Sequence, residues 1–256
     1  MRLFPAQTGF LLATLISLDA GAVTTRAWET ATYKEFDEGE GERALITSDG
    51  AVLPGTAIKR TDLETDAIWS AVRAPDGTVY AGSVADGVIY QIGGGAKKKL
   101  ASLDKETPWI GSLVLGADGT LYAGTLGTAE VVAVDTRTGK TRIVAKLEGA
   151  SHIWAMAIVG RTLYAGTGPN GKLFAIDLGG GKPRSVWEGA DKHLLSMAPA
   201  GDGTLWISTS DEAILFRFDP KTGQARAVAD FAGTEIKAIA AMGDADIVAA
   251  DRKSVV

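Results

Sequence analysis

Gly-Thr-Leu-Tyr-Ala-Gly-Thr occupies residues 119–125, and closely related heptapeptides occupy residues 77–83, 161–167 and 203–209. The aromatic position of this motif recurs every 42 residues, at Tyr80, Tyr122, Tyr164 and Trp206. A second marker keeps the same step, at Asp135, Asp177 and Asp219. A fixed period of this length is the sequence signature of a repeat architecture, so the repeat decides the fold.

Each repeat unit has the pattern of four short strands. In the third unit, residues 152–158 are compact and apolar, and residues 162–167 return after a turn. Residues 172–177 alternate in a period of two, and residues 182–187 are more polar. Four strands in about 40 residues, with apolar character falling outward, predict an all-β fold. We expect a β-propeller of four-stranded antiparallel blades, incomplete at its C-terminal end.

Acidic residues in this chain fall at predicted turns. Asp-Gly pairs at residues 76–77, 118–119 and 202–203 predict hairpin turns between first and second strands. Asp135 and Asp219 begin the predicted turns between third and fourth strands. We therefore interpret these carboxylates as turn residues rather than calcium ligands. Lys97, Lys98 and Lys99 are also predicted to form a solvated turn.

The repeat sets the predicted boundaries. The propeller covers residues 42–250, with an outer hairpin at 42–66, blades at 68–108, 109–151, 152–192 and 193–235, and a partial blade at 236–250. Residues 251–256 break the repeat, which predicts a non-native tail and further blades beyond it; a genuine polar tail is the alternative.

The N-terminal segment is typical of a secretory signal peptide. Arg2 precedes an apolar run at residues 9–18, and small residues follow up to Ala22. The run is too short to span a membrane, which needs about 20 residues. We expect cleavage after Ala22, a flexible acidic lead-in at residues 23–41, and a periplasmic or extracellular location. A buried N-terminal helix is the alternative.

Composition excludes several function classes. The chain has 256 residues, 46% hydrophobic and 22% charged, with a formal net charge of −5. A mildly acidic chain is a poor candidate for non-specific nucleic-acid binding, and we expect neither a nucleic-acid partner nor a membrane span. The absence of cysteine excludes disulfides, thiolate metal sites and cysteine nucleophiles. No motif predicts a cofactor or a metal site.

Five aromatic side chains are the candidate site residues. His152 and His193 fall near equivalent starts of inner strands, where propeller enzymes place ligands and bases, so they are the catalytic candidates. The alternative is two ordinary histidines at strand ends. Trp69, Trp109 and Trp154 start three successive inner strands and could bind a sugar or a flat ligand, or pack one blade against the next.

The repeat resembles secreted bacterial β-propellers of the quinoprotein-like, NHL-like and WD40-like group. The resemblance covers residues 68–250 and rests on the heptapeptide, on Gly-Lys-Leu-Phe-Ala-Ile-Asp at residues 171–177 and on Thr-Gly-Lys at residues 138–140. The fourth unit, over residues 202–223, is also similar to streptogramin B lyase repeats. These families share blade motifs while their chemistries differ, so the resemblance implies a fold and not one activity.

Two functions follow from these observations. The first is an exported, non-catalytic propeller that binds a protein or carbohydrate ligand, because no polar constellation converges in the sequence. The second is a propeller lyase or hydrolase with its site at the channel mouth near His152 and His193. A quinone-dependent dehydrogenase is a distant third, since the tryptophan positions of that family's blades are not reproduced.

Overall fold

The computed structural model describes residues 44–46, 51–55, 60–84, 86–103, 109–242 and 247–252. The chain divides into two units, Met1–Thr61 and Asp62–Val256. Every regular element in the described residues is a β-strand. The predicted signal peptide, the acidic lead-in and residues 253–256 lie outside these residues.

The first unit contains one antiparallel hairpin. Its strands are β1 (Ala44–Ile46) and β2 (Val52–Pro54), which pair through Leu45 and Leu53. Both strands lie within the outer hairpin that the sequence predicts at residues 42–66.

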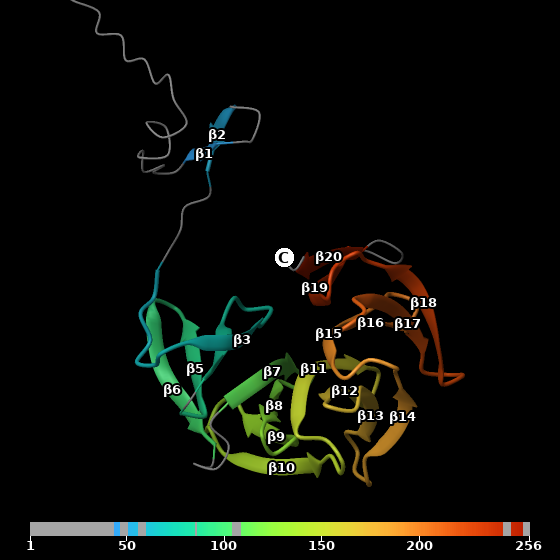
Figure 1. Cartoon of the computed structure of the whole chain (residues 1–256). Helices are drawn as coiled ribbons and strands as arrows, with labels where there is room; N and C mark the ends of the chain where they lie inside the picture. The colour runs from blue at the N-terminus through green and yellow to red at the C-terminus, as the bar shows by residue number, and fades with distance from the viewer. Residues whose placement is uncertain are drawn as a thin grey trace, which may run out of the picture. The chain divides into compact units, whose positions relative to one another are not determined.

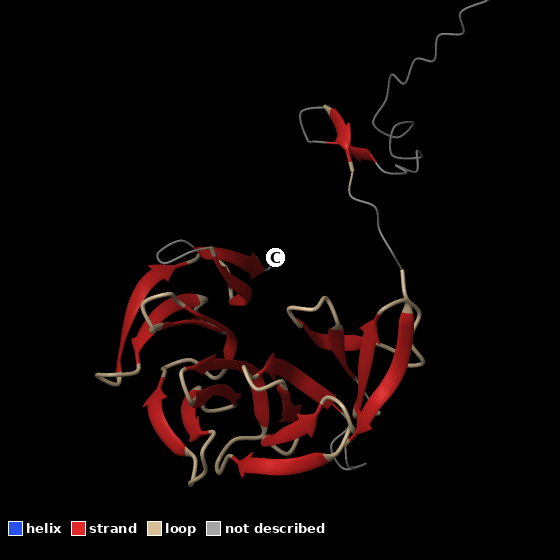
Figure 2. Cartoon of the chain, turned by 180° about the vertical axis from the view of Figure 1, so that it is seen from behind, coloured by secondary structure: helices blue, strands red, loops and turns tan. Residues whose placement is uncertain are grey.

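The second unit contains four groups of four antiparallel strands, each called a sheet below, and a final hairpin (Figures 1 and 2). The second and third groups are joined into one eight-stranded sheet. The first sheet comprises β3 (Ile68–Arg73), β4 (Val79–Ser83), β5 (Val88–Gly93) and β6 (Ala96–Ser102). The second comprises β7 (Trp109–Leu115), β8 (Thr120–Leu126), β9 (Glu130–Asp135) and β10 (Thr141–Lys146). The third comprises β11 (His152–Val159), β12 (Thr162–Gly168), β13 (Lys172–Asp177) and β14 (Arg184–Glu188). The fourth comprises β15 (Leu194–Pro199), β16 (Leu205–Thr209), β17 (Ile214–Asp219) and β18 (Gln224–Asp230), and the hairpin is β19 (Glu235–Ala241) with β20 (Ile247–Arg252).

The sheets of the second unit follow one another along an arc, as propeller blades do. Within this unit β3 contacts β7, β7 contacts β11, β11 contacts β15 and β15 contacts β19. These first strands lie on the inner side of the arc, and β6, β10, β14 and β18 lie on the outer side (Figure 1). One ladder pair, His152 with Leu126, also joins the second and third sheets. The predicted antiparallel β-propeller fold is therefore confirmed.

The hydrophobic core lies between neighbouring sheets. Each large buried cluster draws its side chains from two consecutive sheets, or from the fourth sheet and the hairpin. The repeated glycine of the heptapeptide makes this contact close. A Cβ atom on Gly124 would lie 2.6 Å from Cγ2 of Ile153 in the next sheet, and Gly82 and Gly166 approach Ile110 and Leu194 in the same way. The first three sheets have glycine where one blade packs on the next, whereas the fourth has Ser208, whose hydroxyl donates a hydrogen bond to the carbonyl of Ile236.

The last residue of the heptapeptide holds the following turn. The hydroxyl of Thr125 accepts a hydrogen bond from the amide of Glu130 at 2.8 Å and donates to its carbonyl at 3.2 Å. Thr209 makes the same pair of bonds with Ile214. These hydroxyls are fully buried. A buried hydroxyl without a hydrogen-bond partner would destabilise the fold. The threonine therefore needs the turn for its partners, and the turn needs the threonine hydroxyl to hold its backbone.

The acidic residues have the turn roles that the sequence predicts. Oδ1 of Asp118 accepts a hydrogen bond from the amide of Thr120 at 3.0 Å. Oδ1 of Asp135 accepts bonds from the amides of Arg137 and Thr138 at 2.8 and 3.0 Å. These bonds favour the ionised carboxylates and lower the pKa of both residues. The structural interpretation of these carboxylates is confirmed.

The prediction that Lys97, Lys98 and Lys99 form a turn is wrong, because all three lie on strand β6. The turn before them is tighter than expected: Gly94 and Gly95 take φ angles of +57° and +81° and reverse the chain on their own. The exposed lysines therefore line the outermost strand, where charge discourages pairing with another strand.

Candidate functional site

Each inner strand carries a β-bulge at the same register. The ladder of β3 shifts between Ile68 and Ser70, and those of β7, β11, β15 and β19 shift at the corresponding positions. The bulged positions hold Trp69, Gly111, Trp154, Leu195 and Lys237. A bulge re-aims the side chain of the extra residue, so the four side chains at these positions leave the regular alternation of the strand, and Gly111 contributes none.

The three tryptophans predicted as site residues meet at one place. The ring centroids of Trp69 and Trp109 are 6.4 Å apart, and those of Trp69 and Trp154 are 6.2 Å apart. Trp69 and Trp154 come from the first and third sheets, so they meet across the second. At the bulge of that sheet Gly111 has no side chain to separate them. Trp69 and Trp109 remain 52% and 41% exposed.

The two histidines extend the same cluster. The ring of His152 stacks on Trp154 with a centroid distance of 5.1 Å and an interplanar angle of 8°. The ring of His193 meets Trp154 edge-on, at 5.6 Å and 89°, and lies 6.5 Å from His152. We call these five rings, Trp69, Trp109, Trp154, His152 and His193, the aromatic platform.

A hydrogen bond fixes the tautomer of His193. The indole Nε1–H of Trp154 donates to Nδ1 of His193 at 3.0 Å. Tryptophan is a donor only, so Nδ1 carries no proton in this arrangement. Gly168, at the end of β12, makes the contact possible, because a Cβ atom there would overlap the His193 ring. Neither Gly168 nor the bulge was predicted from the sequence, although the repeat places Leu126, Gly168 and Ser210 at equivalent positions at the ends of the second strands.

Electrostatics favour the neutral form of His193. Burial is the main cause that lowers its pKa, and the nearby His152 lowers it further. Asp211 and Glu235 oppose this effect, whereas Lys192 supports it. The hydrogen bond from Trp154 and the lowered pKa agree, because a protonated imidazole has no free acceptor at Nδ1.

Acidification is therefore expected to weaken the fold through His193. The pKa in the folded protein lies below the ordinary value of 6.5, so the unfolded chain binds the proton more strongly. The stabilising contribution is complete above pH 6.5 and is lost as the pH falls toward the folded pKa. Melting curves between pH 7.5 and 5 should show a decline in the native chain that is smaller in His193→Gln. Equal declines in the two proteins would contradict this.

In the described residues, no further acidic group completes a metal site with the two histidines. Across the part of the chain that the structure describes, no three His, Cys, Asp or Glu side chains are close enough to share a metal ion. The two histidines are brought together, as their spacing predicts, but within the described residues they are accompanied by tryptophans rather than by carboxylate ligands. In the same residues no helix has the length and apolar character to cross a membrane.

Comparison with known sequences gives one family. The family described as outer membrane protein assembly factor BamB matches residues 71–227, which is more than half of the chain. A search of curated protein sequences found no match.

Solved structures share the propeller fold. A catalytically inactive virginiamycin B lyase from Staphylococcus aureus with quinupristin has a TM-score of 0.65 at 15% identity, over 81% of this chain and 70% of that one. The extracellular domain of a putative one-component system from B. thetaiotaomicron has 0.61 at 16%, over 86% and 33%. A chain of a nidogen/laminin complex has 0.62 at 13%, over 72% of each.

These similarities are limited to the fold. The chain spans about a third of the extracellular domain, and it covers 54% of a second virginiamycin B lyase structure. At such low identities the shared feature is the arrangement of blades, and function must be argued from the site.

Proposed function

This chain belongs to the family of outer membrane protein assembly factor BamB, and from that premise we propose that it is an exported, non-catalytic binding propeller. Its aromatic platform contacts the ligand, which is a segment of another protein. Export proceeds through the N-terminal signal peptide, with cleavage near Ala22 and a periplasmic or extracellular location.

The exposure of the tryptophans is the observation that carries this proposal. Two neighbouring indoles that are 52% and 41% exposed form an apolar surface that a protein normally covers. Tryptophan is also the residue most enriched among those that dominate binding energy. Because the indole rings already contact each other, no group fits between them. The ligand therefore lies across the exposed faces of the rings.

Protein is favoured over carbohydrate as the ligand. The family description is that of an assembly factor for outer membrane proteins, and one structural neighbour is part of a protein–protein complex. In the described residues two polar groups at the platform already have partners: the Ser151 hydroxyl is hydrogen-bonded to Nδ1 of His152, and Nδ1 of His193 is occupied by Trp154. A carbohydrate site needs such groups to hold hydroxyls.

A lyase or hydrolase at the histidine pair is the second candidate. Its support is the 6.5 Å separation of the His152 and His193 rings and a fold shared with virginiamycin B lyase. Against it, the Trp154 bond occupies one nitrogen of His193, and a catalytic metal needs about three protein ligands.

A titration separates these functions. The full chain is titrated with a synthetic strand-forming peptide that carries aromatic residues at alternate positions, and in parallel with chitohexaose, while tryptophan fluorescence is followed. The proposal expects saturable binding of the peptide, unchanged by EDTA, with no change in peptide mass. Binding of chitohexaose alone would reject a protein ligand. EDTA-sensitive conversion of either probe, lost in His152→Ala and His193→Ala, would favour the enzyme.

A further inference from the structure

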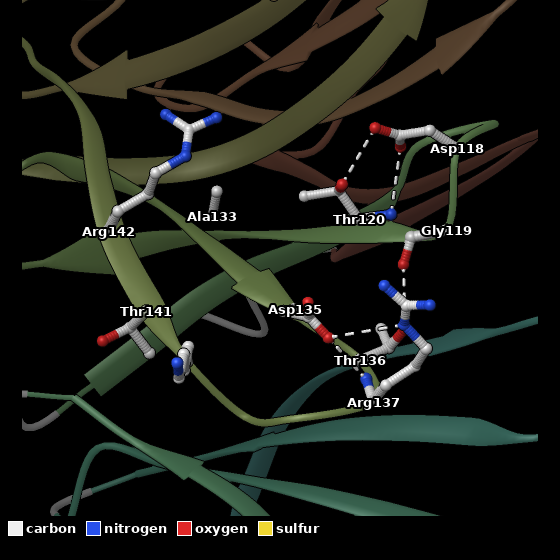
Figure 3. Close-up of a pocket in the computed structure, with 10 residues that line it drawn as sticks. Asp118, Gly119, Thr120, Ala133, Asp135, Thr136, Arg137, Thr141 and Arg142 are labelled. Atoms are coloured by element: carbon white, nitrogen blue, oxygen red, sulfur yellow. Dashed lines mark hydrogen bonds and ion pairs between the residues drawn. The ribbon is translucent and has the colours of Figure 1, made fainter.

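Apart from the aromatic platform, a hollow lies on the surface of the second sheet, at the opposite end of β7 from Trp109. Its volume is about 600 Å³. Figure 3 shows Asp118 and Thr120 on one wall and the guanidinium of Arg142 on the other. Residues that line it include Asp118, Thr120, Ala133, Asp135, Arg137 and Arg142. The platform does not contribute to this hollow.

In the fourth sheet an arginine side chain occupies the position that corresponds to this hollow. There Arg217 on β17 donates from Nε to Oγ1 of Thr204 at 2.8 Å. Its terminal nitrogen lies 2.6 Å from Oδ2 of Asp202. Its Cζ atom lies 4.6 Å from the ring centroid of Trp206. A carboxylate, a hydroxyl and an aromatic face therefore form a complete guanidinium site.

The second sheet keeps this site but lacks the arginine. Asp118, Thr120 and Tyr122 stand two repeats before Asp202, Thr204 and Trp206, and Ala133 stands where the fourth sheet has Arg217. Within the described residues Asp118 forms no ion pair, although its bonds to Thr120 lower its pKa and keep it ionised. Ala133, the position of the missing arginine, borders the hollow, which is larger than a single arginine side chain.

The other two sheets lack this combination. In the third sheet Gly160 replaces the carboxylate, and Ala175 occupies the position of Ala133. In the first sheet the carboxylate is present as Asp76, but Gln91 fills the position of the missing arginine. Of the four described four-stranded sheets, only the second combines an acid with an empty arginine position.

We propose that this hollow binds the guanidinium group of an arginine side chain presented by a partner protein. A planar guanidinium satisfies the carboxylate and the hydroxyl together, which an ammonium does less well. Of the basic lining residues, Arg137 faces Asp135 with 3.9 Å between Nε and Oδ1. Arg142 pairs with Ala133 across the β9–β10 ladder and lies on the wall opposite Asp118 (Figure 3). All three lining cations, Arg137, Lys140 and Arg142, are exposed, so solvent screens their charge.

The first test uses blocked arginine as the probe. The full chain is titrated with Nα-acetyl-arginine amide, and the amide signals of residues 118–120 are followed by NMR. We expect saturable shifts, at least about tenfold weaker binding in Asp118→Asn, and none with the neutral isostere Nα-acetyl-citrulline amide. Binding of inorganic phosphate or Nα-acetyl-aspartate amide at these residues instead would overturn the proposal, as would the absence of saturable arginine binding.

The second test restores the arginine within the chain. Ala133→Arg is expected to raise the melting temperature by about 2 °C and to abolish binding of the probe. The matched control is Ala175→Arg, which has no carboxylate beside it and should bring no gain. A gain that persists after Asp118→Asn is added would contradict the proposal. If Ala133→Arg does not fold, the titration of the native chain with Nα-acetyl-arginine amide still tests whether the hollow binds arginine.

The Trp69→Ala variant separates this proposal from the one about the platform. It should lose peptide binding at the platform and keep arginine binding at the hollow.

Discussion

The Trp69→Ala variant is expected to bind the strand-forming peptide at least about 30-fold more weakly than the native chain. Trp69 links the other two tryptophans of the platform, because its centroid lies 6.4 Å from that of Trp109 and 6.2 Å from that of Trp154. Removing it opens a gap between the other two and divides the surface. Fluorescence titration and calorimetry with the same peptide would measure the loss.

The control for this variant is Trp187→Ala. Trp187 lies on β14, on the outer side of the third sheet, and contacts Phe216 of the fourth sheet at 5.0 Å. Its removal costs packing but leaves the platform untouched, so peptide affinity should stay within about twofold. Trp69 is half exposed, and its substitution should leave the melting temperature nearly unchanged. Equal affinity losses in the two variants would rule out the platform as the binding surface.

The Gly124→Val variant is expected to lose about 3 kcal/mol of unfolding free energy, since overpacking a core typically costs 1–3 kcal/mol and occasionally more. A Cβ atom at this position would lie 2.6 Å from Cγ2 of Ile153 and 2.5 Å from Oγ of Ser112. Both neighbours are buried, so neither can move freely. The expected fall in melting temperature is roughly 6–12 °C.

Two comparisons isolate the cause of that loss. Gly149→Ala, where φ is +75° and no atom lies within 4 Å of the added Cβ, should lose only about 1 kcal/mol through backbone strain. Combining Gly124→Val with Ile153→Ala should cost less than the sum of the two single variants, because the second change removes the clashing methyl group. Full additivity would show that sheet-to-sheet contact is not the reason for the glycine.

The fold could be predicted because the residue type at each repeated position is explained by contacts within its own blade or with the next one. Thr125 bonds the turn that follows it, Asp118 bonds the turn that precedes β8, and Gly124 sits where the next sheet approaches. These causes act within one unit or between neighbours, so they recur with the period. Lys97 was misplaced because two adjacent glycines close a shorter turn than the other units use.

The site could be predicted only in part. The repeat register placed Trp109, His152 and His193 near the starts of inner strands; Trp109 and His152 begin β7 and β11, and His193 immediately precedes β15. It did not foresee that Trp69 and Trp154 meet across the second sheet, because that contact depends on the bulges and on the missing side chain of Gly111. Side-chain directions inferred from a period of two hold only for a regular strand, and a bulge breaks that period without a signal in the sequence pattern. The empty arginine position was visible in the sequence, as Ala133 and Ala175 against Arg217, but only the structure shows its acceptors.

The bulge shared by all the inner strands has a consequence for how such chains diversify. Its backbone shift is present whether the residue is Trp69, Gly111, Trp154, Leu195 or Lys237. The backbone shift is therefore compatible with side chains as different as those of glycine, leucine, tryptophan and lysine. If the proposed binding role holds, a substitution at one of these positions would change ligand preference while leaving the blades intact, so copies of one ancestral unit could acquire new specificities without refolding.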